Sequence, residues 1–297
     1  MRHALILAAV GSLTGAVYAQ APAAAGKQTV FVSVVDGKGA PVPNLTAADF
    51  TVKEDGKTQE IVSAAVATTP MQVALMVDNS GLALNSIREA AALFIQRLQG
   101  RGEISLIATP GRNLTVVPYT ASLPALMEGM NKMLARNQTG GYLLDGLLET
   151  SKDFTTRSVA RPVIVMLIVP GQEFSSTRAE VVLDGIQRSR ASVYVIELGA
   201  PTATGMGSLD AKADDSTVDE SARRNAVLGA APARTGGRAE QVMAASGLTN
   251  VMAKVAEELI GQYAITYAAA GPANNAKLSV ETKAKGAKVR APQRVTR

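Results

Sequence analysis

The stretch that most constrains the fold is an apolar run at residues 73–77 that stops abruptly at Asp78-Asn79-Ser80-Gly81. An uninterrupted apolar run of this length predicts a strand buried on both faces, as in the parallel sheet of an α/β protein. A helical pattern follows at residues 85–98 and ends at Gly100. The polar residues that end the run should therefore lie at the carboxyl edge of a sheet, where open α/β sheets bind their ligands.

The rest of the central region alternates strand and helix patterns. A second apolar run covers residues 163–169, and shorter β patterns cover 103–108, 114–117 and 192–198. Helical patterns lie between them and at 250–262. This order predicts an α/β fold with a mostly parallel sheet and right-handed crossovers. Residues 200–235 are rich in small and polar residues and lack the spacing of a calcium loop, so we expect a flexible surface insertion there.

Both flanks of this region have β patterns. Residues 28–68 contain two hairpin-like units, the second with Asp55-Gly56 between short β runs, and residues 263–293 contain two further runs. Neither flank is large enough to fold alone. We therefore predict that the flanks pair with one another in a small β-sandwich-like part, with the central unit inserted between them.

The first residues have the basic start, apolar middle and small-x-small end of a secretory signal peptide at 1–19, followed by a linker at 20–27. We expect export to the periplasm or the exterior. Cleavage would also remove His3, the only histidine, from a chain that has no cysteine. The mature chain then has no residues for a Ser-His-Asp or Cys-His nucleophile, a His/Cys zinc site or a disulfide.

The basic residues are concentrated near the end of the chain. Residues 277–297 contain seven Lys or Arg against one Glu. Such a segment is either a solvated strand face or a weak contact for anionic surfaces. Nucleic acid is not an expected partner, because no aromatic residues alternate with the basic ones.

Four segments resemble the von Willebrand factor type A fold, and more closely the exported VWFA-related proteins abundant in Acidobacteria. They are VDGKGAPVPNLTAADFTVKEDGKTQEI, VALMVDNSG, TGGR at 235–238 and VAEELIGQYAITY, in the order that the family has them. The resemblance implies a type A domain at 70–262, which is a Rossmann-like, mostly parallel sheet wrapped by helices, with a metal-ion-dependent adhesion site at its carboxyl edge. In the family, three loops supply Asp-x-Ser-x-Ser, a Thr and an Asp, a ligand set that suits Mg²⁺.

Transferred to this chain, the implied site is incomplete. Asp78 and Ser80 match the first loop, but Leu82 takes the third position and has no donor atom. Gly141 stands at the Thr position and Pro170 at the Asp position. The candidate metal ligands are thus Asp78 and Ser80, with Glu173 and Thr139 as the available compensators. We expect no resident cofactor and only weak binding of Mg²⁺.

These observations predict an exported, non-catalytic protein-binding or adhesion-type module with a degenerate metal-ion-dependent adhesion site. Its partner would be another protein of the cell envelope or exterior. Three alternatives stay open: metal-dependent adhesion through a remodelled site, a structural envelope component, and a hydrolase that uses Ser80. The last lacks a histidine in the mature chain and the Gly-x-Ser-x-Gly elbow.

Overall fold

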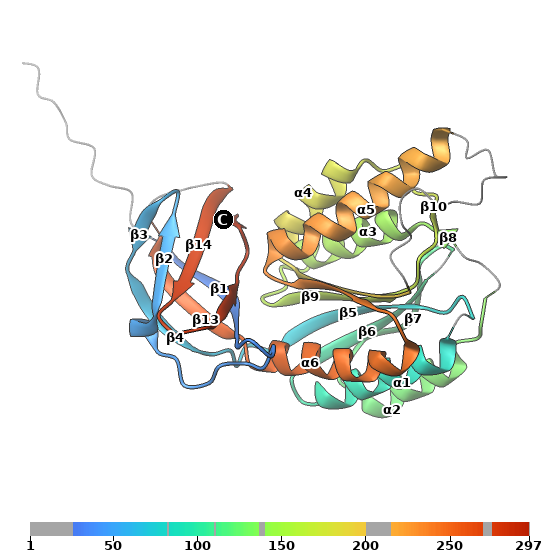
Figure 1. Ribbon diagram of the computed structural model, residues 1–297, viewed down its shortest axis with the longest axis horizontal. Coiled ribbons are helices and arrows are strands. Elements are labelled where there is room, and N and C mark those ends of the chain that lie inside the picture. Colours follow the sequence, from blue (N-terminus) through green and yellow to red (C-terminus); the bar gives the residue numbers. More distant parts are fainter. Residues whose placement is uncertain are drawn as a thin grey trace, which may run out of the picture.

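The computed structural model describes residues 26–81, 83–109, 111–136, 140–199, 215–269 and 275–296. The predicted signal peptide lies outside these ranges. The chain forms an α/β unit and a smaller β unit that lie side by side (Figure 1). Among the described residues, no helix is both long and apolar enough to cross a membrane.

The α/β unit is built on a six-stranded sheet. Its strands, in spatial order, are β12 (Arg238–Val242), β11 (Ser192–Leu198), β9 (Pro162–Ile168), β5 (Met71–Asp78), β6 (Gly102–Thr109) and β7 (Leu114–Thr120). All neighbours are parallel except β6 and β7. From β5 on, this is the doubly wound order 3-2-1-4-5-6, and the direction of winding changes between β5 and β9. The predicted fold class is confirmed.

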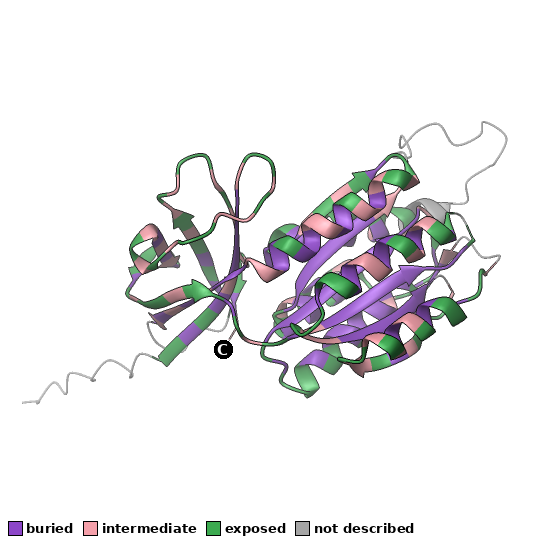
Figure 2. Ribbon diagram, turned by 90° about the horizontal axis from the view of Figure 1, so that it is seen from below, coloured by how far each residue is buried: buried purple, intermediate pink, exposed green. Residues whose placement is uncertain are grey.

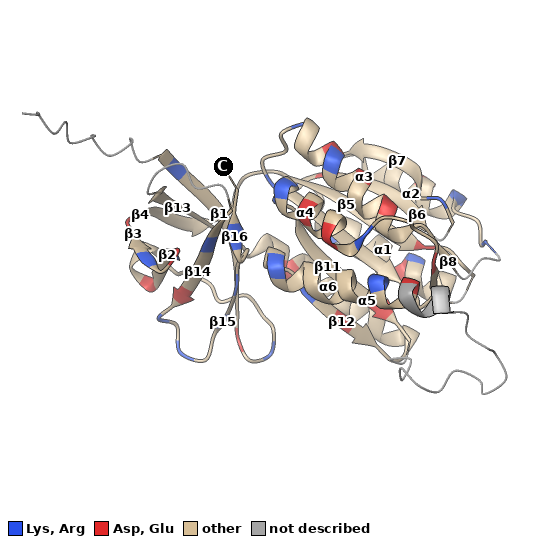
Figure 3. Ribbon diagram, turned by 90° about the horizontal axis from the view of Figure 1, so that it is seen from above, with Lys and Arg blue, Asp and Glu red and all other residues tan. Residues whose placement is uncertain are grey.

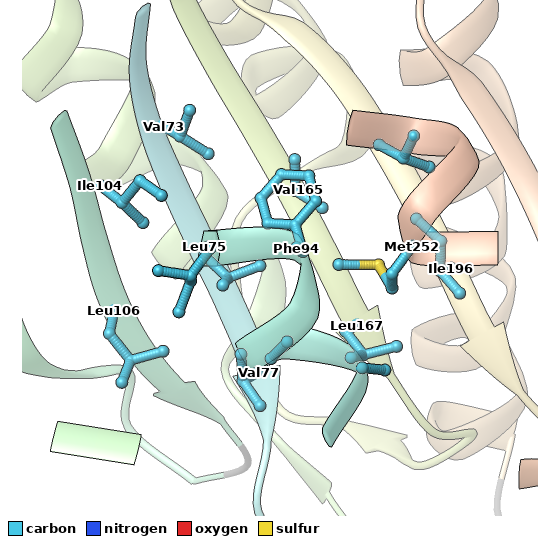
Figure 4. Packing of buried hydrophobic residues seen from close by; sticks show 14 of the residues in the cluster. Val73, Leu75, Val77, Phe94, Ile104, Leu106, Val165, Leu167, Ile196 and Met252 are labelled. Atoms are coloured by element: carbon cyan, nitrogen blue, oxygen red, sulfur yellow. The ribbon is translucent and has the colours of Figure 1, made fainter. Parts of the chain in front are cut away.

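Helices cover both faces of the sheet (Figure 1). One face carries α1 (Leu84–Arg97), α2 (Leu123–Lys132) and α6 (Leu248–Ile260), and the other carries α3 (Leu143–Thr156), α4 (Ala179–Ser189) and α5 (Asp215–Thr235). Two apolar clusters fill the layers between sheet and helices. Figure 4 shows Leu75 and Val165 of the central strands facing Phe94 of α1. Figure 2 shows the buried strands between partly exposed helices.

Helix α5 differs from the expected flexible insertion over 200–235. Residues 215–235 are helical, and Val227, Leu228 and Ala231 are buried against the second cluster. Alanines, Gly229 and Pro232 dilute the apolar stripe, so the helical periodicity is weak in the sequence although the helix packs on the sheet. Residues 200–214 lie outside the described ranges.

The β unit consists of strands from both flanks of the chain. One sheet has the order β15 (Lys288–Arg290), β1 (Gly26–Val35), β13 (Tyr263–Ala269) and β4 (Ile61–Val66). The second has the order β16 (Arg294–Val295), β14 (Ala276–Thr282), β2 (Phe50–Glu54) and β3 (Lys57–Gln59). Antiparallel pairs β1–β13 and β2–β14 join the amino-terminal flank to the carboxyl-terminal one. An apolar cluster that includes Val32, Val52 and Tyr267 fills the space between the sheets.

Buried polar residues connect the two units. Arg161 donates to the carbonyl of Leu259 at 2.6 Å and to Gln262 Oε1 at 2.9 Å. Gln262 Nε2 in turn donates to Ser33 Oγ of β1 at 3.2 Å. Glu258 of α6 accepts from Arg290 of β15 at 2.9 Å. The relative position of the units is therefore set by charged and polar groups that have few alternative partners once they are buried.

Candidate functional site

The predicted site lies where the winding of the sheet reverses. Asp78 ends β5, and two short strands, β8 (Gly140–Gly141) and β10 (Gln172–Glu173), pair in parallel beside it. This pairing brings the loops before α3 and after β9 together. A small pocket of about 30 Å³ opens between them, and its lining residues include Asp78, Thr109, Glu173 and Arg224.

Asp78 caps the turn that follows its strand. Its Oδ1 accepts a hydrogen bond from the backbone amide of Ser80 at 2.8 Å. Burial raises the pKa of the Asp78 carboxyl, while the Ser80 hydroxyl and amide and the charge of Arg224 act in the opposite direction. The neighbouring Asn79 donates through Nδ2 to the carbonyl of Leu134 at 2.8 Å. The turn therefore holds its own shape through protein hydrogen bonds.

Glu173 is the second carboxylate of the pocket and is only 1% exposed. Its Oε1 accepts from the backbone amide of Ser175 at 3.0 Å, whereas its Oε2 has no partner among the described residues. Burial raises the pKa of Glu173, and the hydroxyl and amide of Ser175 lower it. Of the two compensators expected from the sequence, Glu173 thus lies in the pocket with Asp78. Thr139 and Leu82 lie outside the described ranges.

Gly141 explains why this site cannot contain the family's Thr at that position. A Cβ added there would lie 2.4 Å from the backbone nitrogen of Gly111, which is closer than real Cβ atoms approach. The close passage of these two backbones is fixed by the hydrogen bond from the Gly111 amide to the carbonyl of Gly140 at 3.1 Å. Any side chain at residue 141 would force the loops apart.

Sequence reasoning missed three lining residues. Thr109 and Asn113 present Oγ1 and Oδ1, which are buried and have no partner among the described residues. Thr109 follows directly after the β pattern predicted at 103–108, so its place at an edge of the sheet could have been inferred. Arg224 comes from α5, the helix that the sequence did not reveal, and it is 6% exposed.

Arg224 places a positive charge beside the two carboxylates. Its Nη2 donates to the carbonyl of Val169 at 3.2 Å and to Glu197 Oε1 at 2.9 Å. The same guanidinium lowers the pKa values of Asp78 and Glu173 against the effect of burial. The protein therefore supplies part of the charge compensation that a metal ion would give.

The residues present do not fit a resident Mg²⁺. That ion requires a nearly ideal octahedron of oxygen ligands. In this pocket, Asp78 and Glu173 each commit one oxygen to a backbone amide, and the Thr position is a glycine without space for a side chain. The guanidinium of Arg224 lines the same pocket and repels a second cation. Among the described residues, no group of three or more His, Cys, Asp or Glu forms a metal-binding cluster.

Four exposed apolar side chains lie at the same edge of the sheet as the pocket, and one of them, Tyr142, lines it. Leu114, Leu134, Tyr142 and Phe174, which we name the apical patch, all belong to loops or strand ends at the carboxyl edge of the sheet. They are between 38% and 76% exposed. The rings of Tyr142 and Phe174 lie 6.0 Å apart, so the two loops joined by β8 and β10 present one aromatic surface.

No protein-family model and no curated protein matches the sequence. Solved structures do match. A von Willebrand factor type A structure from Catenulispora acidiphila is 13% identical, covers 86% of this chain and 74% of its own, and has a TM-score of 0.49. BatB from Bacteroides thetaiotaomicron is 16% identical over 64% of this chain and 98% of its own, with a TM-score of 0.44.

A third similar structure is proximal thread matrix protein 1 from the mussel byssus, described with a zinc-occupied MIDAS motif. It is 9% identical over 65% of this chain, with a TM-score of 0.47, and this chain spans about half (49%) of its length. The strand order and the helices on both faces by themselves give the α/β unit a doubly wound, Rossmann-like architecture. The chain is similar to these von Willebrand factor type A structures, and at these identities and TM-scores the similarity says nothing about the roles of residues.

Proposed function

We propose that this chain is an exported, non-catalytic module whose type A unit binds another protein through the apical patch, without a bound metal. The observation that carries the proposal is the position of the exposed apolar side chains. Eight large apolar residues are exposed in the described part of the chain, and the four of the apical patch, with Met243, lie at the carboxyl edge. Concentrated exposed apolar surface is typical of interaction sites.

The chemistry beneath the patch supports a protein ligand. Tyr142 and Phe174 offer large rings on short, well-supported loops, and aromatic residues dominate the energetics of protein interfaces. Thr109 and Asn113 line the adjoining pocket, where Oγ1 and Oδ1 are buried and have no partner among the described residues. Apolar surface with a few polar groups is a common arrangement in recognition pockets.

Export rests on the predicted signal peptide, and the absence of catalysis rests on the residues of the site. Ser80 is 8% exposed, and its backbone amide is held by Asp78. The mature chain would have no histidine to activate its hydroxyl. A serine at this turn is better explained as part of the hydrogen-bonded cap.

The proposal is tested by pull-down from envelope extracts with the signal-free chain and with Tyr142→Ser and Phe174→Ser. We expect a partner that the unmodified chain retains to be lost from both variants, since truncating an interface aromatic commonly weakens binding by tenfold or more. Val181→Ser is the matched control, because Val181 is 44% exposed on α4 and Phe174 is 45% exposed. The proposal would be overturned if both apical variants captured the partner as well as the unmodified chain and the control do.

Calorimetry with Mg²⁺ and Mn²⁺ tests the metal-independent part. We expect no heat of binding for the unmodified chain or for Asp78→Ala, and we expect partner capture to be unaffected by a chelator. Saturable binding of Mg²⁺ that disappears in Asp78→Ala would instead establish metal-dependent adhesion through a remodelled site.

A further inference from the structure

A second candidate ligand site lies at the junction of the two units, away from the apical pocket. A groove with a cavity volume of about 60 Å³ is lined by β1, the end of α4, the start of β11, the end of α5 and the segment around β16. Because β11 begins at the amino edge of the parallel sheet, the groove lies at the edge opposite to Asp78. No residue lines both the groove and the apical pocket.

The charged residues that line the groove all have the same sign. They are Arg190, Arg234 and Arg294, and no Asp or Glu is among the lining residues. None of the three forms an ion pair within the described part of the chain. Figure 3 shows basic positions near the end of α4 and at β16, on the two sides of the junction.

Helix ends account for only part of this arrangement. Arg190 caps α4 and Arg234 lies in the last turn of α5, where basic side chains compensate the helix dipole. Arg294 belongs to β16 of the other unit, and within the described ranges its side chain donates to the carbonyl of Asn275 at 2.8 Å. Folding therefore places the Arg294 guanidinium in the same groove as those of Arg190 and Arg234, although neither of these two has a carboxylate partner within the described part of the chain.

The floor of the groove is apolar. Val30, Ile186, Ala191 and Val295 line it and are buried by the surrounding chain. A small hydrated anion would use the guanidinium groups and leave this floor empty, whereas a neutral apolar molecule would leave the guanidinium groups without a partner. An anion on an apolar stem uses both, because a carboxylate matches the planar fork of arginine while its chain covers apolar surface.

We propose that this groove binds an aliphatic carboxylate, with the carboxylate between the arginines and the chain on the apolar floor. The chemistry is shared by a fatty acid and by a polypeptide carboxyl terminus with an apolar last residue. This site is independent of the proposed apical function, and its failure would leave that function untouched.

Isothermal titration calorimetry of the full chain with octanoate tests the proposal. We expect saturable binding that weakens at least tenfold in Arg234→Gln and in Arg294→Gln, and that is unchanged in Arg112→Gln, an exposed arginine on an apical loop. Octanol and inorganic phosphate should each bind at least tenfold more weakly than octanoate. A peptide with a free carboxyl-terminal Leu, compared with its amide, distinguishes the polypeptide source from the fatty acid.

A second kind of variant, which fills the groove and keeps all three arginines, shows whether lost binding could simply reflect unfolding of the arginine variants. Thr29 is exposed on β1 and lines the groove, so Thr29→Trp fills the space from a surface position. We expect this variant to melt like the unmodified chain and to lose octanoate binding. The proposal would be overturned if neither octanoate nor the peptide with a free carboxyl terminus bound. It would also be overturned if octanol or phosphate bound as tightly as octanoate, or if Thr29→Trp bound octanoate as well as the unmodified chain does.

Discussion

Replacing Glu258 by Gln should reveal how strongly the two units are held together. The side chain of Glu258 is fully buried, and its Oε2 lies 2.9 Å from Arg290 of the β unit and 3.8 Å from Arg238 of β12. Gln keeps the shape and removes the only carboxylate between two guanidinium groups. Arg290 then has no carboxylate partner in the described part of the chain, whereas Arg238 keeps its ion pair with Glu240. Removing one partner of a buried ion pair costs about 3 kcal/mol or more. For a chain of this size, that loss corresponds to a fall in Tm of roughly 6–12 °C.

The adjacent residue supplies a matched control. Glu257 lies on the same helix and pairs with Arg97 at 2.6 Å, but both side chains are more than 40% exposed. Exposed pairs contribute about 0–1 kcal/mol, so Glu257→Gln should change the Tm by less than about 3 °C. Circular dichroism melts compare the two variants directly. If Glu258→Gln lowers the Tm no more than Glu257→Gln does, the buried ion pair does not hold the units together. A double-mutant cycle with Arg290→Gln should give a coupling above about 1 kcal/mol.

Three further perturbations test the site and the core. Asp78→Asn keeps the oxygen that accepts the Ser80 amide and removes a buried charge. Because burial holds the folded pKa above the ordinary value of 3.8, ionised Asp78 costs stability above its folded pKa, and the cost disappears as pH falls. We therefore expect Asp78→Asn to melt above the unmodified chain at neutral pH and level with it in acid. Arg224→Gln should lose about 3 kcal/mol, because Glu197 loses its buried partner, and Mg²⁺ should raise the Tm of this variant alone. Leu75→Ala leaves a cavity at the centre of the sheet and should cost about 3 kcal/mol in urea unfolding.

The fold could be predicted from the sequence wherever a local pattern is compatible with only one kind of secondary structure. The apolar runs at 73–77 and 163–169 could only be strands buried on both faces, and β5 and β9 are adjacent at the centre of the sheet. The Asp55-Gly56 pair likewise predicted a tight turn, and both residues have positive φ between β2 and β3. Helix α5 was missed because only Val227 and Leu228 are large apolar residues on its buried face, which also contains Arg224, Pro232 and Thr235.

The site was predictable only in part, for a related reason. Asp78 ends β5 and Glu173 lies five residues after the end of β9, so strand prediction places both near the edge. Arg224 reaches the same pocket from a helix about fifty residues further along the chain, and its position depends on how α5 packs. The apical patch was also not predicted, because isolated exposed apolar residues such as Leu134 and Phe174 look like ordinary core positions until the loops are placed.

The two proposed ligand surfaces are far enough apart to be tested separately. The eight residues of β5 run from one edge of the sheet to the other, and at about 3.3 Å per residue they span roughly 26 Å. At about 0.1 M salt the screening length is about 10 Å, so a charge at one edge has little effect at the other. Neutralising Arg234 should therefore leave partner capture at the apical patch unchanged, and Phe174→Ser should leave octanoate binding unchanged. Loss of both activities in one variant would mean unfolding and not removal of a contact, and a melt of the same sample separates these cases.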